Sequence, residues 1–311
     1  MIMYYLASDS VATSFSKCFA LGPKGSGATH ARAQNTFIQF EAFCKAKQFG
    51  CVRPDTITAK QARQFIEHRI AHGIAKRTLQ NEISHVRRAM RGAGRNLGDI
   101  HRSDHPFSNR RCGLERASRK SYKAPCSMAA YESAIENGSD GLEHVLRLQK
   151  VLGLRAQEAV IAGNLSQWVT QFHKTGPNNT SHLLLTFGTK GGRPRHIRVH
   201  PHHLDEVRQV VLEAHAYKQV HGHIIKAKNL KKAMRKYHNE MTALGLTGDN
   251  SGHGLRRLFA WQQFKDYLAS GLSEQGALAS LSMDLGHGEG RGRWVKNNYL
   301  CGMLEGGRNH G

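Results

Sequence analysis

Large apolar side chains recur at helical spacing in the first third of the chain. Between residues 31 and 49 they recur every three residues, which predicts a helix with an aromatic stripe facing a core: Phe37, Phe40 and Phe43. Thr58 and Gln61 have the spacing of a capping box, so a second helix begins there and ends near Gly73. A third helix, from about residue 76, has one apolar stripe of Leu79, Ile83, Val86 and Met90.

The pattern changes and then returns in the second part of the chain. Helices are predicted over 128–137 and 141–152, followed by strands over 164–171, 181–187 and 196–200. The glycines and proline of 188–194 mark a hairpin loop between the last two strands. Further helices are predicted near 202–221, 226–244, 254–270, 273–285 and 293–300. The predicted fold class is mainly α with a small antiparallel β-sheet.

A length of 311 residues fits two domains. Residues 1–28 end in a Gly-Pro-Lys-Gly-Ser-Gly run and are predicted to be a flexible segment before the first helical domain, 29–95. Residues 96–125 are rich in glycine, serine and arginine and are predicted to be a basic interdomain linker. The second domain is then 126–311.

Charge narrows the class of partner. The chain has 45 Lys and Arg against 23 Asp and Glu, a net charge of +22, and both halves are basic. Such an excess favours a polyanion, nucleic acid before an anionic membrane surface. The sequence has no signal peptide and no apolar run of the length that crosses a membrane. The six cysteines have no C-x₂-C spacing of the kind found in zinc sites or redox pairs, so we expect reduced, mostly packed thiols.

Several residues of the second domain could act on a phosphate, although each alone is more often structural. Arg155 and Glu158 are three residues apart on one predicted helix, and Lys190 stands in the hairpin loop. His253 and Arg256 have the same three-residue spacing at the start of another helix. The remaining candidates are His287, after a helix end, and Tyr299.

Together these motifs resemble the tyrosine recombinase, or phage integrase, family. The resemblance rests on Gly-Leu-Arg-x-x-Glu, on His-x-Leu-Arg-Arg-x-x-Ala, on Leu-Gly-His, and on the order in which these residues and Tyr299 follow one another. It covers roughly residues 30–300, and it implies that the helical domain is a core DNA-binding domain and the second domain is catalytic. The implied activity is site-specific DNA recombination through a 3′-phosphotyrosine intermediate, as in the integrase of a mobile genetic element.

The resemblance also implies a role for each residue. Tyr299 is the nucleophile, Arg155 and Arg256 stabilise the phosphoryl charge, and Lys190 is the general acid. His253 and His287 divide between proton transfer near the nucleophile and a hydrogen bond to the phosphate, while Glu158 orients Arg155 or a histidine and does not react itself. Because the cationic side chains take the place of metal ions, the resemblance implies no metal and no cofactor. The spacing of twelve residues between His287 and Tyr299 is a few longer than usual for the family.

Other expectations concern partners and location. The expected partner is double-stranded DNA at attachment sites, bound by a homotetramer in the synaptic complex, with an accessory DNA-bending or directionality factor and no membrane. The expected location is the bacterial cytoplasm, with the nucleoid. Predicted DNA-binding residues are Arg77, Arg88, Arg91, Arg95, Arg110, Arg111, Lys231, Lys232 and Arg235.

Two other classes of protein remain open at this point. One is a DNA-binding regulator built on an inactive recombinase fold, which the intact set of six catalytic candidates argues against. The other is a type IB topoisomerase, which shares the chemistry but relaxes one duplex without exchanging partners.

Overall fold

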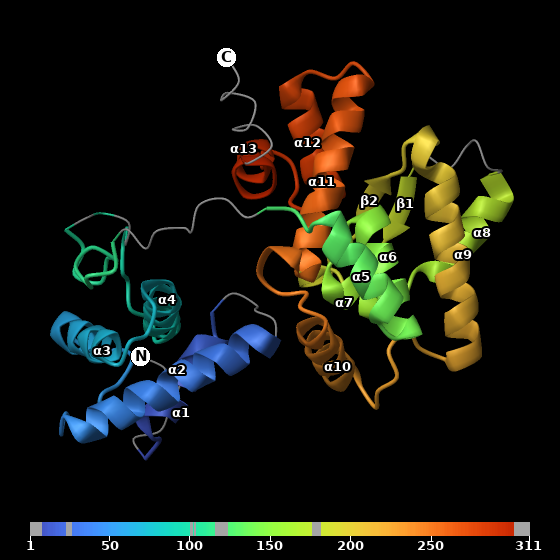
Figure 1. The fold of residues 1–311 in the computed structure, drawn as a ribbon. Coiled ribbons are helices and arrows are strands. Elements are labelled where there is room, and N and C mark those ends of the chain that lie inside the picture. The colour runs from blue at the N-terminus through green and yellow to red at the C-terminus, as the bar shows by residue number, and fades with distance from the viewer. Residues whose placement is uncertain are drawn as a thin grey trace. The chain divides into compact units, whose positions relative to one another are not determined.

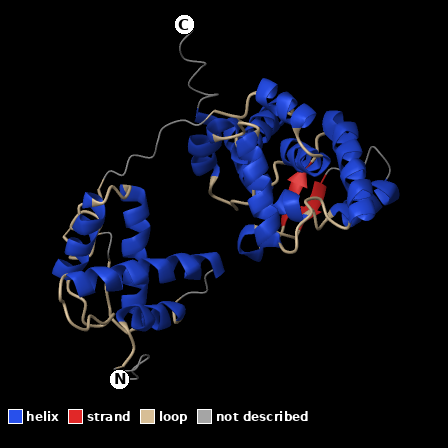
Figure 2. Ribbon diagram, turned by 60° about the horizontal axis from the view of Figure 1, so that its bottom comes forward, coloured by secondary structure: helices blue, strands red, loops and turns tan. Residues whose placement is uncertain are grey.

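The computed structural model describes residues 8–22, 27–99, 102, 104–115, 124–175 and 182–301. The chain divides into two compact units, Met1–Arg119 and Lys120–Gly311 (Figure 1). Each unit has its own hydrophobic core, so each is described by itself. Helices account for most of the described part of both units, and the strands that the structure describes lie in the second (Figure 2).

The described residues of the first unit form the helices α1 (Val11–Ala20), α2 (Gly27–Ala46), α3 (Ala59–Ala71) and α4 (Lys76–Gly92). The aromatic stripe predicted on α2 is buried, and Phe40 packs edge-on against Phe65 of α3. The predicted capping box is present, because Thr58 and Gln61 each accept a hydrogen bond from the other's backbone N–H.

The prediction that residues 1–28 are a flexible segment is wrong for residues 11–20. These residues form α1, which packs against α2 and α4 and is capped by the Ser10 hydroxyl. Its side chains Phe15, Cys18 and Phe19 are buried in the core. The glycine-rich run after this segment suggested a loop. Burial of three side chains on one face stabilises the ten-residue helix despite that run. Residues 1–7 and 23–26 lie outside the described part of the chain.

The predicted linker, 96–125, is also wrong over its first part. Leu97, Phe107, Cys112 and Leu114 are buried against the core of the first unit. The carbonyl of Phe107 accepts hydrogen bonds from the buried Arg87 guanidinium of α4. Four widely spaced apolar residues do not form a periodic pattern, so sequence alone does not reveal this folded extension. Residues 116–123 of the predicted linker lie outside the described residues.

The second unit surrounds one hairpin with helices. Strands β1 (His182–Leu185) and β2 (Arg195–Arg198) are antiparallel, with His182 opposite Arg198 and Leu185 opposite Arg195. The short turn η1 (Lys190–Gly192) lies between them, and η2 (Pro201–His203) follows. The helices are α5 (Met128–Asn137), α6 (Asp140–Leu152), α7 (Ala156–Ile161), α8 (Leu165–Thr175), α9 (Leu204–His221), α10 (Leu230–Ala243), α11 (Gly252–Ala269), α12 (Glu274–Asp284), α13 (Gly292–Val295) and the π-helical turn η4 (Lys296–Leu300), with a further turn η3 (Gly248–Asn250) before α11.

The strand predicted over 164–171 is wrong, because this segment belongs to α8. Leu165, Trp168 and Phe172 are three and four residues apart, and all three are buried on one side of the helix. The Trp168 indole N–H donates to the carbonyl of Leu184 in β1, 2.8 Å away. A short apolar run is compatible with the period of a helix or of a strand. In the folded protein, packing of one side of the segment against the core selects the helix. No helix among the described residues is long and apolar enough to cross a membrane.

Candidate active site

Arg256 lies at the centre of the site and is almost fully buried, with 1% of its surface exposed. Its guanidinium donates to the carbonyls of Gly153 and Leu285, and its Nε–H faces the Tyr299 hydroxyl at 3.4 Å. Burial lowers the pKa of Arg256 to about 10, so the side chain is a cation at neutral pH. Three of its five N–H donors are used in these contacts, which leaves two for an anion.

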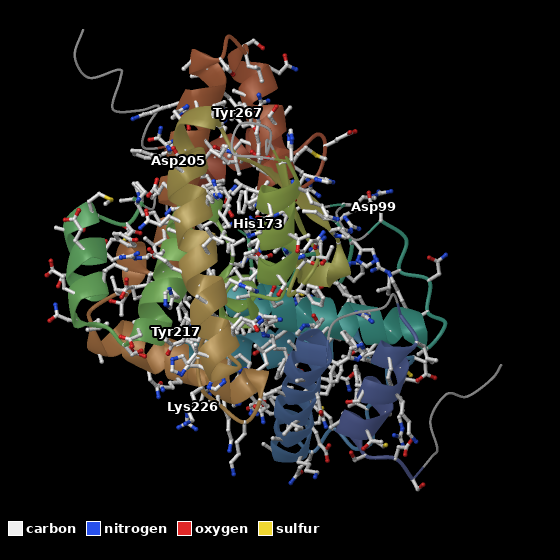
Figure 3. All side chains as sticks on the ribbon, turned by 90° about the vertical axis from the view of Figure 1, so that its right-hand side faces the viewer. Asp99, His173, Asp205, Tyr217, Lys226 and Tyr267 are labelled. Atoms are coloured by element: carbon white, nitrogen blue, oxygen red, sulfur yellow. The ribbon has the colours of Figure 1, made fainter. Side chains whose placement is uncertain are left out.

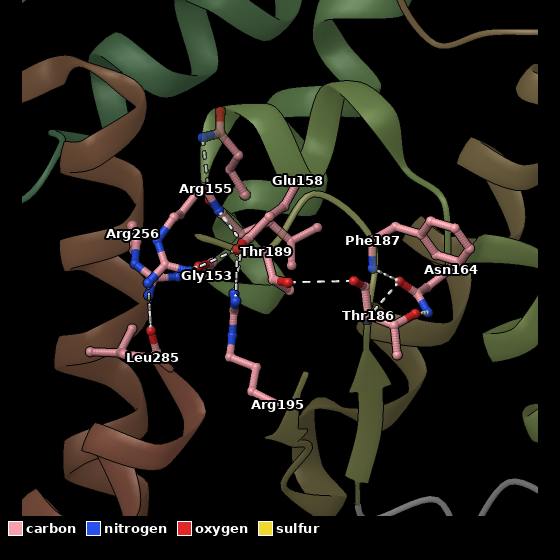
Figure 4. Close-up of polar contacts among 12 residues, drawn as sticks. Gly153, Arg155, Glu158, Asn164, Thr186, Phe187, Thr189, Arg195, Arg256 and Leu285 are labelled. Atoms are coloured by element: carbon pink, nitrogen blue, oxygen red, sulfur yellow. Dashed lines mark hydrogen bonds and ion pairs between the residues drawn. The ribbon is translucent and has the colours of Figure 1, made fainter. Parts of the chain in front are cut away.

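Arg155 and Arg195 share the carboxylate of Glu158. Glu158 Oε1 and Oε2 are each 2.7 Å from the Arg195 guanidinium, and Oε1 is 2.7 Å from Nη1 of Arg155 (Figure 4). Burial opposes the charge on Glu158, but the ion pair with Arg195 and the N–H groups of Arg155 outweigh it and lower its pKa to about 2. The carboxylate is therefore a fixed anion that holds two cations in place.

Sequence reasoning placed Glu158 beside Arg155 but missed Arg195. Arg195 begins β2, nearly buried, and pairs with Glu158 through two parallel hydrogen bonds. The only sequence signal would have been an arginine immediately before the strand predicted over 196–200, two residues from Ile197 and so on the same face of that strand.

Two glycines explain why the motifs have the form Gly-Leu-Arg and Leu-Gly-His. Gly153 ends α6 at a φ of +57°, and a Cβ there would lie 2.3 Å from the ring of Phe259. Gly286 follows α12 at a φ of +65°, and a Cβ there would lie 2.8 Å from the Arg195 side chain. The carbonyl before Gly286, that of Leu285, accepts from both Arg155 and Arg256. The motifs thus build backbone acceptors that orient the arginines.

Tyr299 lies against His287 despite the long spacing between them. Its hydroxyl is 3.3 Å from Nε2 of His287, and only 3% of the residue is exposed. The intervening residues fold into α13 and η4, and the Trp261 indole N–H holds the carbonyl of Tyr299 at 2.7 Å. The ring of Trp294 in α13 packs on His287 with 4.4 Å between centroids. The π-helical turn accommodates the extra residues and returns the hydroxyl to the site.

The two histidines differ in burial. Burial, followed by the charges of Arg256 and Arg155, lowers the pKa of His287 to about 3, so its ring is neutral. His253 is exposed in the first turn of α11, and its ring centroid is 5.6 Å from that of Tyr299. The backbone of Lys190 lies in η1 of the hairpin, while its side chain is outside the described structure.

Asn164 fixes the hairpin that carries Lys190. Its Oδ1 accepts from the backbone N–H groups of Thr186 and Phe187, both at 3.1 Å, where β1 ends (Figure 4). Asn164 is buried, and the sequence analysis did not identify it. Asn164 stands at the start of the strand predicted over 164–171, and its contact with the hairpin has no local signal in the sequence.

The predicted DNA-binding residues fall into two groups. Arg88 and Arg95 make contacts within the first unit. Arg88 lies over the ring of Phe19 at 4.0 Å, and Arg95 donates to the carbonyl of Ile57 at 2.6 Å. The others are exposed, on α4, on the folded extension and on α10: Arg77, Arg91, Arg110, Arg111, Lys231, Lys232 and Arg235. Arg77 donates a hydrogen bond to the side-chain amide oxygen of Gln80, and Arg110 lies 3.9 Å from the carboxylate of Glu115.

Replacing Glu158 with Gln is expected to lower the free energy of unfolding of the second unit by about 3 kcal/mol at pH 7. Folding lowers the pKa of Glu158 from 4.5 to about 2, so its stabilisation is present above pH 4.5 and lost as the pH falls toward 2. The difference from wild type should fall to about half at pH 3 and vanish near pH 2.

Urea unfolding followed by tryptophan fluorescence measures this difference. All three tryptophans, Trp168, Trp261 and Trp294, are in the second unit, so the signal reports that unit alone. Glu132, an exposed carboxylate on α5, provides the control Glu132→Gln, which should be near neutral. A Glu158→Gln difference that does not change with pH would contradict the expectation.

Comparisons with known proteins agree with this geometry. A family model described as Integrase matches residues 113–263, and one described as phage integrase, N-terminal, matches residues 16–97. No curated protein sequence matches significantly.

Among solved structures, the integrase of the transposon Tn1549 in complex with transposon right end DNA matches with a TM-score of 0.54 and 13% identity, over 97% of this chain and 100% of that one. The same integrase with a circular intermediate DNA gives 0.53 and 14%, over 96% and 99%. A lambda integrase tetramer bound to a Holliday junction gives 0.49 and 18%, over 90% and 74%. The first two matches show a shared fold. The two family models between them span both units, and the chain belongs to the integrase family of tyrosine-type, site-specific recombinases.

Proposed function

We propose that the chain cleaves and rejoins DNA at specific sites with Tyr299 as its nucleophile. The observation that carries this proposal is the position of the Tyr299 hydroxyl, 3.4 Å from Nε of Arg256 and 3.3 Å from Nε2 of His287. For a phenol to attack a phosphodiester, the developing negative charge must be stabilised and the phenol proton removed. The Arg256 cation can do the first and the His287 imidazole the second.

In the proposed step, the oxygen of Tyr299 attacks the scissile phosphorus and forms a 3′-phosphotyrosine bond. The phenol proton passes to Nε2 of His287, the ring nitrogen 3.3 Å from the hydroxyl. The bond from phosphorus to the 5′-oxygen breaks, and Lys190 gives that oxygen a proton. In the second half-reaction, a 5′-hydroxyl from another strand attacks the phosphotyrosine and gives its proton to Lys190. The bond from phosphorus to the Tyr299 oxygen breaks, and His287 returns the proton to that oxygen, which restores Tyr299 and a phosphodiester.

The cations have separate tasks in this proposal. The two remaining N–H donors of Arg256 and the guanidinium of Arg155 bind non-bridging oxygens of the phosphate, where they offset the charge that develops in the transition state. His253, exposed one turn before Arg256, donates to the same phosphate. Glu158 and Arg195 position Arg155 and do not contact the substrate.

The proposed partner is double-stranded DNA at attachment sites, in keeping with the DNA present in the Tn1549 integrase structures. The family resemblance further implies a homotetramer that holds two sites together, an accessory DNA-bending or directionality factor, and work at the bacterial nucleoid. The integration or excision of a mobile element is the reaction that such an assembly performs.

A nicked suicide duplex tests the proposal. When the 5′-hydroxyl leaves on a short fragment that diffuses away, the phosphotyrosine cannot be resealed, and wild type should accumulate a denaturant-resistant adduct on its own attachment site. An absence of adduct would favour an inactive DNA-binding regulator. Relaxation of a supercoiled plasmid without an attachment site would favour a type IB topoisomerase, whereas recombinants formed only between matching sites support a recombinase.

The exposed arginines of α4 are expected to bind phosphates. The double variant Arg77→Gln/Arg91→Gln should flatten the slope of log K against log salt by nearly one unit for each phosphate that it no longer binds. Fluorescence anisotropy of labelled duplex at several salt concentrations measures the slope. Arg147→Gln is the matched control, because Arg147 is paired with Glu143 and Glu213 at 2.8 Å and should leave the slope unchanged. An unchanged slope in the α4 variant would mean that its arginines are solvated in the complex.

A further inference from the structure

A group of histidines lies on the second unit outside the site described above. His200, His202 and His203 surround Pro201 where β2 leads through η2 into α9. Nε2 of His202 is 3.2 Å from Oδ1 of Asp266 in α11, and Nε2 of His203 is 3.1 Å from Oδ2 of the same carboxylate. Asp205, two residues after His203, and Tyr267, the residue after Asp266, are labelled in the upper part of Figure 3.

The donor set is that of a transition metal. The two imidazole nitrogens and one carboxylate oxygen lie within 4.8 Å of one another. Zinc binds such ligands at about 2.0–2.2 Å in a tetrahedron, which places neighbouring ligand atoms a little over 3 Å apart. Calcium and magnesium prefer oxygen ligands, so two imidazoles argue against them. The distances in the structure need only small side-chain shifts to accept an ion.

A second observation comes from His200, which is 4% exposed. Its Nε2 has no hydrogen-bond partner among the described residues, although a buried polar nitrogen ordinarily has one. Its ring centroid is 5.8 Å from that of His202, and it lines the same cavity as His203, of about 380 Å³. This unpartnered nitrogen can bond to a water molecule held by an ion.

The carboxylate is already held in position. Asp266 is nearly buried, and its Oδ1 also accepts from Nε2 of Gln262 at 2.9 Å, one turn earlier on α11. Metal sites ordinarily have such an outer hydrogen bond, which orients the ligand. His202 by contrast is 58% exposed at its side chain, so an ion can enter from solvent.

We propose that His202, His203 and Asp266 bind one zinc ion, with a water molecule in the fourth position bonded to His200. The ion joins the segment after β2 to α11, the helix that carries His253 and Arg256. It would therefore brace the two elements that position Arg195 and Arg256. This site is separate from the proposed catalysis, which uses none of its four residues.

Calorimetric titration of the metal-free full chain with zinc tests the proposal. We expect one ion per chain, and a Kd at least tenfold weaker in His202→Ala, His203→Ala and Asp266→Asn. The matched control is His68→Ala/His72→Ala, which removes a half-buried and an exposed histidine of the first unit with ring centroids 4.3 Å apart and should leave the Kd unchanged. Free zinc at about a hundred times the Kd should raise the Tm of the second unit by about 5–10 °C.

The exposed position of His202 keeps the test decisive if Asp266→Asn does not fold, because His202→Ala removes a ligand without opening the core. Zinc binding of equal strength in wild type and His202→Ala would overturn the proposal, as would the absence of saturable binding. Loss of binding in the His68 and His72 control alone would assign the zinc to surface imidazoles of the first unit.

Discussion

Replacing Tyr299 with Phe is expected to reduce the covalent DNA adduct to background. The variant lacks the oxygen that forms the phosphotyrosine bond, and no neighbouring group can substitute for it. The ring, 3% exposed, keeps its packing against Trp294, so folding and DNA binding should persist. The adduct on a nicked suicide duplex measures the effect, and anisotropy with the same duplex confirms that binding is retained.

Tyr267→Phe is the matched control for this experiment. Tyr267 is also a buried tyrosine of the second unit, but its hydroxyl donates to the carboxylate of Asp284 at 2.6 Å. Loss of that hydrogen bond should cost stability while leaving adduct formation intact. An adduct that survives in Tyr299→Phe, or that is lost equally in Tyr267→Phe, would refute Tyr299 as the nucleophile.

The sequence could predict the candidate catalytic residues, but not the residues that hold them in position. Arg155, Arg256, His287 and Tyr299 come together in the structure as the motif order suggested, since each lies at or near a helix end with a local signature. Arg195 could not be found in this way. Its partner Glu158 is on a different element, and pairing between distant segments leaves no periodic trace in one sequence.

The fold errors have a similar origin. The helix over 11–20 and the folded extension, residues 96–99 and 104–115, are defined by burial against a core that other elements create. Neither has a long run of periodic residues, and glycine and arginine nearby suggested loops. The α8 error differs, because Leu165, Trp168 and Phe172 fit a helix once the length of the run is weighed.

Replacing Arg256 with Lys is expected to slow DNA cleavage by about 10²–10³-fold. Lysine keeps the charge, but one ammonium cannot donate to Gly153, Leu285 and Tyr299 while also binding two phosphate oxygens. The loss should appear in the single-turnover rate of adduct formation with DNA already bound, and not in the affinity for DNA, because the interaction strengthens as charge develops.

Arg257→Lys separates this effect from a general loss of structure. Arg257 is the next residue of α11 and is similarly buried, but its guanidinium donates to the carbonyl of Ala124 and to Asp249, whereas the Nε–H of Arg256 faces the Tyr299 hydroxyl. If buried arginines of α11 act only by stabilising the fold, both variants should lose similar rates and similar unfolding free energy. If Arg256 acts on the phosphate, its variant alone should lose about 10²-fold or more in rate. A rate for Arg256→Lys within threefold of that for Arg257→Lys would remove Arg256 from the mechanism.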